Sequence, residues 1–431
     1  MKKLLVIALA VLLVGAFTLP AMAVDHEFGG YWRTRFYNNT DFTGDDSGAK
    51  DLQQVDTRTR LYYTAILSDE VKLVNKFEMD ANWGDSVRGD IGADGQNFEI
   101  KNSYADFSLG DWNVKLGTQG KTFARGFLFS DDFSGAIVRY VGDDMLIPFI
   151  WMKAYEGGAG EDANDMDVDY YGVDPTFTMG DIKLNPFVLY VTSAGGGDLD
   201  ADADWTGWGD AVGWDSFSIY YLGVNVDFSA EMFSAWLTGI YMGGSVDVSD
   251  AGTTTSPDYY IDTFGTDSFD FAAYLFAVGG TVNLDALSVH GQFFYATGDD
   301  DGYDDDEVSK FYVPKGQSYY WAEIMGLGVF DAQASTGSCA DRIGNIMAAN
   351  VGVDFPMDKL TLILDLWYAS LAEDNAAGDK DLGTEIDVTA KYQLLDDLSV
   401  QAVFAYLSAG DATGGGDENP MEVGVQMSLS F

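Results

Sequence analysis

The last eleven residues of the chain, 421–431, alternate strictly between apolar and polar positions. An alternation of period two places one row of side chains on each face of a β-strand. Eleven residues are also about the length that a tilted strand needs to cross a bilayer. The segment is therefore predicted to be a β-strand whose apolar face either contacts lipid or is buried in a soluble core. Its apolar row consists of Met421, Val423, Val425, Met427, Leu429 and Phe431.

The same alternation recurs along the chain from residue 24 onward, and it is clearest at residues 383–395 and 421–431. The segments between these runs are rich in Gly, Asp and Ser, which is typical of turns and loops. No stretch changes to an extended helical periodicity, so the fold is predicted to be all-β. The predicted strands are residues 27–38, 53–67, 71–83, 97–109, 112–119, 134–141, 145–155, 166–179, 182–193, 214–228, 231–243, 268–283, 285–297, 345–355, 359–371, 383–395, 398–409 and 420–431.

The connections between these eighteen predicted strands alternate in length. Short turns such as residues 68–70 and 110–111 follow the even-numbered strands, and long loops follow the odd-numbered ones. This asymmetry is typical of a transmembrane antiparallel β-barrel, and a soluble β-sandwich has no reason to show it so regularly. We therefore predict a closed barrel of about 18 strands, with both chain ends on the same, periplasmic side. A hairpin within the long connection 304–344 would change the count, so 16 and 20 strands are the alternatives.

Residues 1–23 have the features of a cleavable secretory signal. Lys2 and Lys3 precede a short apolar run at residues 4–17, and Ala21-Met22-Ala23 fits the cleavage site. The apolar run is too short to cross a membrane as a helix. We therefore expect a signal peptide at residues 1–23 and a transmembrane β-barrel with long acidic loops at residues 24–431.

The charge balance narrows the range of partners. The chain has 69 acidic and 23 basic residues, and this net charge of −46 argues against a nucleic-acid partner. Five predicted loops are rich in Asp and Glu, and they either form a solvated acidic surface or bridge divalent cations loosely. Their spacing fits no EF-hand loop, so neither a defined metal site nor a cofactor is predicted. These loops are residues 41–51, 161–169, 198–215, 298–307 and 411–418.

The residues that could carry out catalysis are few. His26 and His290 are the only histidines, and no serine beside them belongs to a recognisable nucleophile motif. Cys339 is the only cysteine, so there is no disulfide framework. We therefore do not expect the chain to be an enzyme.

Two parts of the sequence resemble known membrane barrels. Residues 102–119, preceded by Asp56-Thr-Arg-Thr-Arg60, are similar in spacing and residue type to the early strands of general and alginate-export-type porins. The closing strand, which ends in Phe431, resembles the last strand of Gram-negative outer-membrane barrels. Those porins are eighteen-stranded barrels with basic, anion-conducting lumens, and the fold and the outer-membrane location are what the resemblance implies for this chain. It also implies that Phe431 belongs to the signal that the barrel assembly machinery reads.

Basic residues are concentrated in the first third of the chain, on the polar rows of neighbouring predicted strands. Charges facing lipid near the bilayer midplane would cost about 2–4 kcal/mol each, so these side chains are expected to face the lumen. Two interpretations remain open. The residues form a positive wall that sets ion selectivity, or they only neutralise Asp56, Glu78, Asp80, Glu99 and Asp106. The predicted wall residues are Arg33, Arg35, Arg58, Arg60, Lys72, Lys76 and Lys115.

The predicted loop at residues 120–133 is unusually apolar for a segment in water. Such a loop can fold back into the lumen, bury its phenylalanines on the inner wall and narrow the channel. Packing against neighbouring loops at the rim is the alternative. In the inward arrangement, Lys121 and Arg125 would face the basic wall, with the two aspartates close by. The predicted constriction residues are Lys121, Phe123, Arg125, Phe127, Phe129, Asp131 and Asp132.

Together these features favour an outer-membrane porin, a passive channel for small hydrophilic solutes or ions with a modest anion preference at the constriction. The expected partners are outer-membrane lipid, the assembly machinery and the solutes themselves, and a homotrimer is one assembly to consider. The competing hypothesis is a structural sleeve around a partner such as a multihaem cytochrome. The chain has no C-x-x-C-H motif, so the haem would have to belong to the partner.

Overall fold

The computed structural model describes residues 24–48, 51–86, 89–91, 97–156, 167–194, 214–248, 268–299, 307–330 and 343–431. The predicted signal peptide, most of the acidic loops 161–169, 198–215 and 298–307, and Cys339 lie outside these residues. None of the helices in the described part of the chain is long and apolar enough to cross a membrane.

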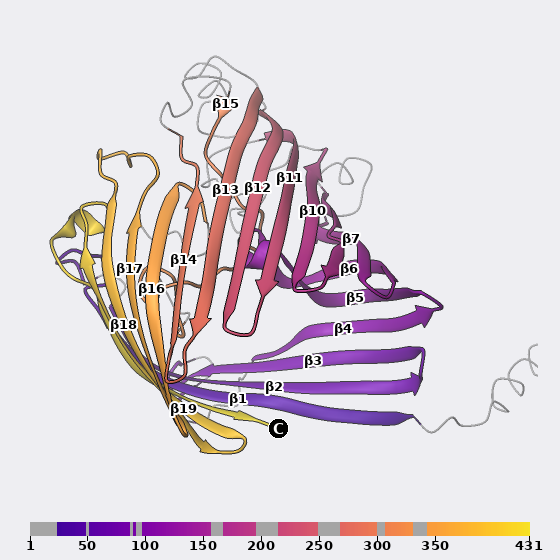
Figure 1. The fold of residues 1–431 in the computed structure, drawn as a ribbon, viewed down its shortest axis with the longest axis horizontal. Coiled ribbons are helices and arrows are strands. Elements are labelled where there is room, and N and C mark those ends of the chain that lie inside the picture. The colour runs from indigo at the N-terminus through magenta and orange to yellow at the C-terminus, as the bar shows by residue number, and fades with distance from the viewer. Residues whose placement is uncertain are drawn as a thin grey trace, which may run out of the picture.

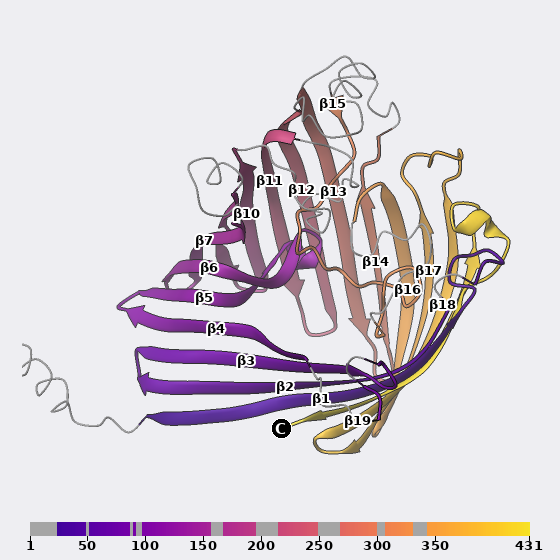
Figure 2. The ribbon, with the colours of Figure 1, turned by 180° about the vertical axis from the view of Figure 1, so that it is seen from behind.

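One antiparallel sheet winds around the molecule and closes on itself (Figures 1 and 2). Each wall strand pairs with the next along the chain, and β1 finally pairs with β20, where Tyr31 lies opposite Ser430. Eighteen strands form the wall, because β8 and β9 together make one strand between β7 and β10. The predicted closed barrel of eighteen strands is confirmed. The wall strands are β1 (Asp25–Thr40), β2 (Leu52–Ser68), β3 (Val71–Asn82), β4 (Asn97–Leu109), β5 (Trp112–Phe123), β6 (Phe129–Val141), β7 (Met145–Tyr155), β8 (Val168–Val173), β9 (Thr176–Met179), β10 (Ile182–Ser193), β11 (Trp214–Ser229), β12 (Phe233–Val248), β13 (Ser268–Asn283), β14 (Ser288–Ala296), β16 (Ile346–Met357), β17 (Leu360–Ser370), β18 (Asp381–Leu395), β19 (Leu398–Ala409) and β20 (Met421–Ser430).

Short turns join the strands at one end of the barrel, as predicted. Gly110 and Gly180 occupy left-handed backbone conformations there, with φ of 61° and 60°, which glycine adopts without a steric penalty. The turn between β13 and β14 is longer than predicted, because β14 begins at Ser288 rather than at residue 285. The start of β1 lies at this turn end, because Asp25 is opposite Ile66 beside the short turn between β2 and β3, and the C-terminal Phe431 bonds to Gly30 of the same strand.

The wall strand predicted at residues 166–179 is interrupted after Val173. Pro175 lacks a backbone N–H, so it cannot donate to the ladder at this point. The side-chain amide of Asn185 on β10 compensates, donating to the carbonyl oxygens of Asp174 and Pro175 at 2.9 and 2.8 Å. The strand therefore divides into β8 and β9 while the wall remains continuous.

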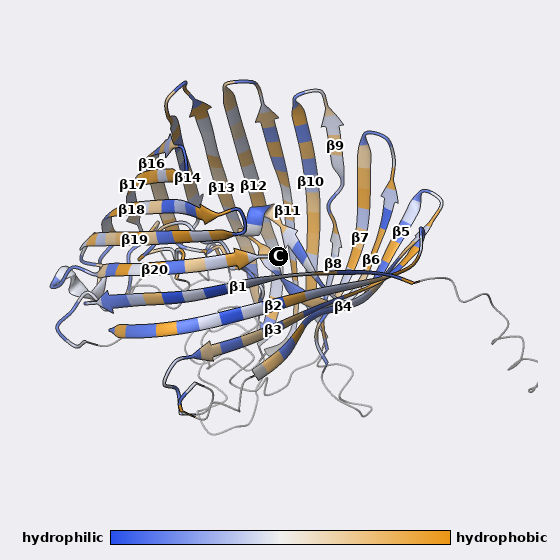
Figure 3. Ribbon diagram, turned by 90° about the horizontal axis from the view of Figure 1, so that it is seen from below, coloured by the Kyte–Doolittle hydropathy of each residue, from blue (hydrophilic) through white to orange (hydrophobic). Residues whose placement is uncertain are grey.

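Hydrophobic and hydrophilic residues alternate along many of the wall strands (Figure 3). On β17, Leu362, Leu364 and Leu366 are exposed on the outside of the barrel, whereas Asp365 points inward and bonds to His290. Such an alternation suits a wall with lipid on one side and a polar interior on the other.

The last residue of the chain, Phe431, extends the pairing between β1 and β20. The backbone N–H of Gly30 donates to the carbonyl oxygen of Phe431 at 2.8 Å, and the N–H of Phe431 donates back to Gly30 at 3.2 Å. A Cβ at position 30 would lie 2.3 Å from the Phe431 ring. Only glycine therefore allows the terminal ring to pack against β1.

Two segments fold into the barrel interior. One is the end of the β5–β6 hairpin, and the other is residues 307–330, which we call the inner segment. It begins with β15 (Glu307–Val308), which pairs in parallel with β13. Phe311, Trp321 and Met325 of the inner segment are buried in the same hydrophobic cluster as Phe127 of the hairpin and Phe294 of β14. The described part of the long connection 304–344 therefore adds no strand to the wall.

Candidate functional site

The β5–β6 hairpin leaves the wall before it ends. β5 pairs with β6 from Trp112 to Phe123, but its pairing with β4 ends at Thr118 and that of β6 with β7 ends at Ser134. The segment predicted as a loop at residues 120–133 is thus mainly a two-stranded hairpin end. Cross-strand hydrogen bonds satisfy its backbone groups once it has left the wall. Only residues 124–128 lie outside the strands, and they include the short helix η1 (Ala124–Gly126).

The apolar side chains of this hairpin end are buried inside the barrel. Phe127 stacks on Tyr319 of the inner segment with 3.7 Å between ring centroids, and it also packs against Phe294. Phe123 packs against Phe187 on β10, and Phe129 packs against Tyr170 on β8. The hairpin end therefore crosses the interior towards the wall formed by β8–β14, as the position of η1 in Figure 1 illustrates.

The sequence predicted that Lys121 and Arg125 would face the basic wall, but both side chains pair with acidic residues on other strands or turns. Lys121 forms an ion pair with Asp174, at the interruption between β8 and β9. Arg125 reaches β11 and β12, where it pairs with Asp227 at 2.8 Å and lies over the Trp236 ring. These acidic and aromatic partners lie far from Lys121 and Arg125 in the sequence, so strand periodicity alone could not reveal them.

Asp132 also has a partner on the neighbouring strand. Its carboxylate accepts a hydrogen bond from the Asn102 side chain at 2.8 Å and lies 3.5 Å from the ammonium of Lys101. These contacts link the hairpin to β4 beyond the point where their backbone pairing ends. Asp131 is exposed.

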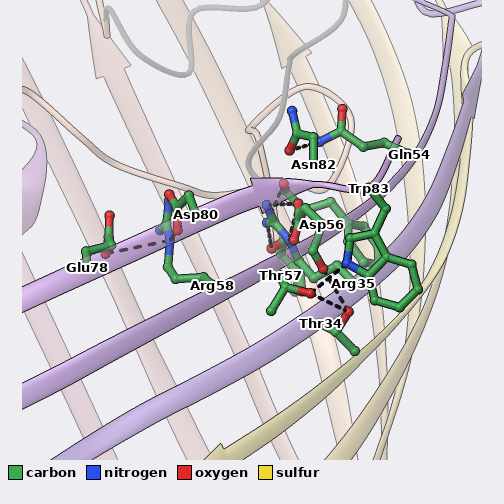
Figure 4. Close-up of polar contacts among 12 residues, drawn as sticks. Thr34, Arg35, Gln54, Asp56, Thr57, Arg58, Glu78, Asp80, Asn82 and Trp83 are labelled. Carbon is green, nitrogen blue, oxygen red and sulfur yellow. Dashed lines mark hydrogen bonds and ion pairs between the residues drawn. The ribbon is translucent and has the colours of Figure 1, made fainter. Parts of the chain in front are cut away.

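Four residues of the predicted basic wall, Arg35, Arg58, Arg60 and Lys115, form ion pairs between neighbouring strands, and Figure 4 shows those of Arg35 and Arg58. Arg58 binds Asp80 through two hydrogen bonds of 2.6 and 2.8 Å, and Arg60 pairs with Glu78. The strand register places these partners directly opposite each other across β2 and β3. Lys115 likewise lies 3.8 Å from Asp106. This part of the wall is therefore a ladder of both signs, as the neutralisation hypothesis expected.

Arg35 differs from the other basic residues because it is only 6% exposed. Its guanidinium group binds Asp56 at 2.6–3.0 Å and donates to the carbonyl oxygens of Val329 and Phe330 in the inner segment. Arg35 thus attaches the inner segment to β1 and is not available to passing ions.

The two remaining lysines of the predicted wall lie on β3, Lys72 beside the turn between β2 and β3 and Lys76 in the middle of the strand. Lys76 lies over the Tyr62 ring, with 6.0 Å from its ammonium nitrogen to the ring centroid. Lys72 is exposed and lies opposite Asp106 in the register between β3 and β4.

Arg33, Arg58 and Arg60 surround a hollow of about 390 Å³ on the inner wall. Tyr31 and Tyr62 complete its polar lining, together with Gly30 and Ser430. The three guanidinium groups can bind an anion through charge-assisted hydrogen bonds, and the two phenol groups can add hydrogen bonds or stacking contacts. This grouping depends on the closure between β1 and β20, which brings Ser430 beside Tyr31.

Three kinds of comparison place this geometry among known proteins. No protein-family model matches the chain, and no curated protein sequence matches it. Its fold is similar to that of the outer membrane protein OpdK from Pseudomonas aeruginosa, with a TM-score of 0.58, 10% identity, and coverage of 94% of this chain and 98% of that one. Pseudomonas aeruginosa OccK8 (OprE) gives a TM-score of 0.57 at 12% identity over 94% and 98% of the two chains.

Acinetobacter baumannii OccAB3 gives a TM-score of 0.57 at 9% identity, over 94% of this chain and 100% of that chain. The fold is that of an outer-membrane porin. At such low identity the similarity concerns the fold, so the interior of this porin fold has to be interpreted from its own residues.

The porin fold brings together one polar cluster that the sequence analysis missed. His290 on β14 lies between two aspartates, with Nε2 2.8 Å from Asp365 and Nδ1 3.3 Å from Asp354. Asn350 donates to the same Asp365 carboxylate at 2.7 Å. A sign of this cluster was available, since all four residues fall on the polar rows of predicted strands.

The acidic loops of the porin fold are described only in part. In the loop at 41–51, the side chain of Ser47, its backbone N–H and the Thr43 hydroxyl all interact with Asp45 and lower the pKa of its carboxyl group. Within the described residues, no group of three or more His, Cys, Asp and Glu side chains has a geometry suited to a metal ion. Loose bridging of divalent cations by the acidic loops stays a prediction.

Proposed function

We propose that this protein is an outer-membrane porin through which small hydrophilic solutes and ions diffuse passively. The observation that carries the proposal is the combination of a closed wall, an apolar outer face and a charged inner face. The closed wall pairs the backbone groups of neighbouring strands and leaves no open sheet edge, and the inner charges offer solutes a hydrated path. The similarity to outer-membrane proteins of known structure supports the same location for this chain.

The narrow part of the path lies, in this proposal, between the hairpin end and the inner wall of β1–β5. The hairpin end and the inner segment bury their apolar side chains together on the side of β8–β19. The hollow beside Arg33, Arg58 and Arg60 lies on the opposite side of the interior, against β1 and β2. Three guanidinium groups against the carboxylates of Glu78 and Asp80 give this region a modest preference for anions.

Ionic screening supports a local origin for this preference. At about 0.15 M salt the Debye length is roughly 8 Å, so charges on distant acidic loops lose most of their influence on the path. Charges that line the hollow act at contact distance and retain their influence.

The occupied interior favours a channel over a structural sleeve. A sleeve must accommodate its partner inside the barrel, but Phe127 and Trp321 are already packed there against the wall. We infer, in addition, that the protein is not an enzyme and uses no cofactor. Recognition of Phe431 by the assembly machinery and formation of a homotrimer are further proposals, which rest on the terminal strand and on the resemblance to porins.

Swelling of liposomes that contain only the purified protein tests the function. We expect influx of small sugars, amino acids and organic anions, with rates that fall steeply as solute size increases. Liposomes that contain the heat-denatured protein serve as the control. Absence of swelling for all solutes, together with copurification of a haem protein, would favour the sleeve.

A further inference from the structure

The last part of the inner segment, residues 321–330, is attached to the wall by carboxylate side chains. We call these ten residues the strap. Glu385 on β18 accepts hydrogen bonds from the backbone N–H groups of Ile324 and Met325, at 2.7 and 2.9 Å. Asp387, two residues further along the same strand, accepts one from the N–H of Glu323 at 3.4 Å. The strap is thus held through the carboxyl groups of a wall strand.

The strap also holds its own fold through a carboxylate. Glu323 accepts a hydrogen bond from the backbone N–H of Val329 at 2.7 Å, which closes the strap into a compact turn. Leu327 within this turn has a φ of 68°, a left-handed conformation that is strained for a residue with a side chain. At the end of the strap, Phe330 stacks on Tyr37 of β1. The turn therefore keeps its shape only while its contacts are intact.

Four carboxyl groups are buried together around the strap. Glu323, Glu385, Asp387 and Glu422 are each less than 10% exposed. Glu385 and Asp387 lie two residues apart on β18, so their carboxyl groups are on the same side of the strand and close together. Within the described residues, Asp387 Oδ1 and Glu422 Oε1 have no hydrogen-bond partner.

Few positive charges face this group of carboxyl groups. On β1, the positive charge of Arg35 favours ionisation of Glu422, but Arg35 is already paired with Asp56. On β18, the positive charge of Lys391 favours ionisation of Glu323. On β17, the negative charge of Asp365 disfavours it. Burying several like charges without equal compensation is costly, so the packed strap requires protons on some of these groups.

We propose that these four carboxyl groups form a proton-dependent latch that holds the strap inside the channel. When protons neutralise the group, the strap stays against β18–β20 and keeps the path narrow. When the protons are lost, the ionised groups must be hydrated, so the strap leaves its position and the path widens. The effect on permeation rests on the proposed porin function, whereas the movement of the strap does not.

The titration of Glu323 sets the pH range. Burial raises the pKa of its carboxyl group to about 7, the hydrogen bond from Val329 opposes the shift, and the nearby Glu385 adds to it. In a released, hydrated strap the same group would have its ordinary pKa of 4.5. Attachment is therefore strongest below about pH 4.5 and weakens as the pH rises through about 7. The difference between these two pKa values allows at most about a 300-fold change in the ratio of attached to released strap.

Single-channel recordings of the full-length protein between pH 5 and pH 9 test the latch. We expect a small conductance to predominate at pH 5 and a larger one to become frequent above about pH 7. Glu323→Gln keeps the acceptor for Val329 without a charge, so this variant should show the small conductance at every pH. Glu307→Gln removes an exposed carboxylate from the start of the inner segment and should behave as the unchanged protein does.

Backbone hydrogen exchange of the unchanged protein gives a readout that needs neither permeation nor a variant. After correction for intrinsic rates, the amides of Ile324, Met325 and Val329 should be protected at pH 5 and exposed at pH 8.5, while strand amides of β18 stay protected. Loss of protection in a protein that conducts no ions would support the latch and contradict the porin. Constant protection together with constant conductance over this pH range would overturn the latch, as would an unaltered pH response in Glu323→Gln.

Discussion

Replacing Arg35 should lower stability while leaving ion selectivity unchanged. The Arg35–Asp56 pair is almost fully buried, with side-chain exposures of 7% and 9%. Removing one partner of such a pair leaves a buried charge uncompensated, and this typically costs about 3–5 kcal/mol. Arg35→Met should therefore lower the free energy of unfolding by about that amount.

The double variant Arg35→Met, Asp56→Leu separates the charge from the packing. Replacing both partners with apolar groups removes the uncompensated charge. The carbonyl oxygens of Val329 and Phe330 still lose a donor, which leaves a remaining loss of about 1–3 kcal/mol. The double variant should thus be more stable than Arg35→Met by about 2 kcal/mol.

Urea unfolding in lipid vesicles, followed by tryptophan fluorescence, measures these values. Lys72→Met is the matched control, because Lys72 is an exposed basic residue on β3 of the same barrel wall. This substitution should change the free energy of unfolding by less than about 0.5 kcal/mol. A loss below about 1 kcal/mol for Arg35→Met, or a double variant less stable than the single one, would refute the structural role of Arg35.

Three further predictions concern the hairpin end, the terminus and bound cations. Phe127→Ala removes a fully buried ring stacked on Tyr319, so it should destabilise the packing of the hairpin end by about 3–5 kcal/mol. Single-channel conductance should therefore rise. A conductance equal to that of the wild-type protein would contradict a narrowing of the channel at this point. Gly30→Val should lower the yield of folded barrel in outer-membrane fractions, because the valine side chain would clash with the Phe431 ring. Deletion of Phe431 should lower this yield as well, while secretion continues. A normal yield of folded barrel would show that the contact is dispensable. Treatment with EDTA should leave conductance unchanged, and a reversible loss on chelation would reveal a structural cation.

Local sequence patterns predicted the barrel wall because each strand carries its own signal. In strands such as β17 and β18, alternating side chains face lipid and the interior, so the period of two survives in the sequence. The split of one strand into β8 and β9 was not predicted, although Pro175, which removes a ladder donor, was a sign of it. The pairing of Arg58 with Asp80 required the strand register, and turn lengths restrict that register once the strands are assigned.

The contents of the interior could not be predicted in the same way. The inner segment has no periodicity, and its position depends on contacts with residues far away in the chain, such as those of Ile324 with Glu385. Arg125 likewise finds Asp227 only after the hairpin has crossed the barrel. Apolar content indicated that the hairpin end would be buried, but not which wall would receive it.

The reversal potential of the purified protein in planar bilayers, under a salt gradient at neutral pH, tests the central claim most directly. We predict ion conductance with a modest preference for anions. In the variant that replaces Arg33, Arg58 and Arg60 by glutamine, the local formal charge falls by three units and Glu78 and Asp80 lose their partners, so the preference should shift towards cations, most clearly at low salt. A protein that conducts no ions, or a variant with an unchanged reversal potential, would contradict the account.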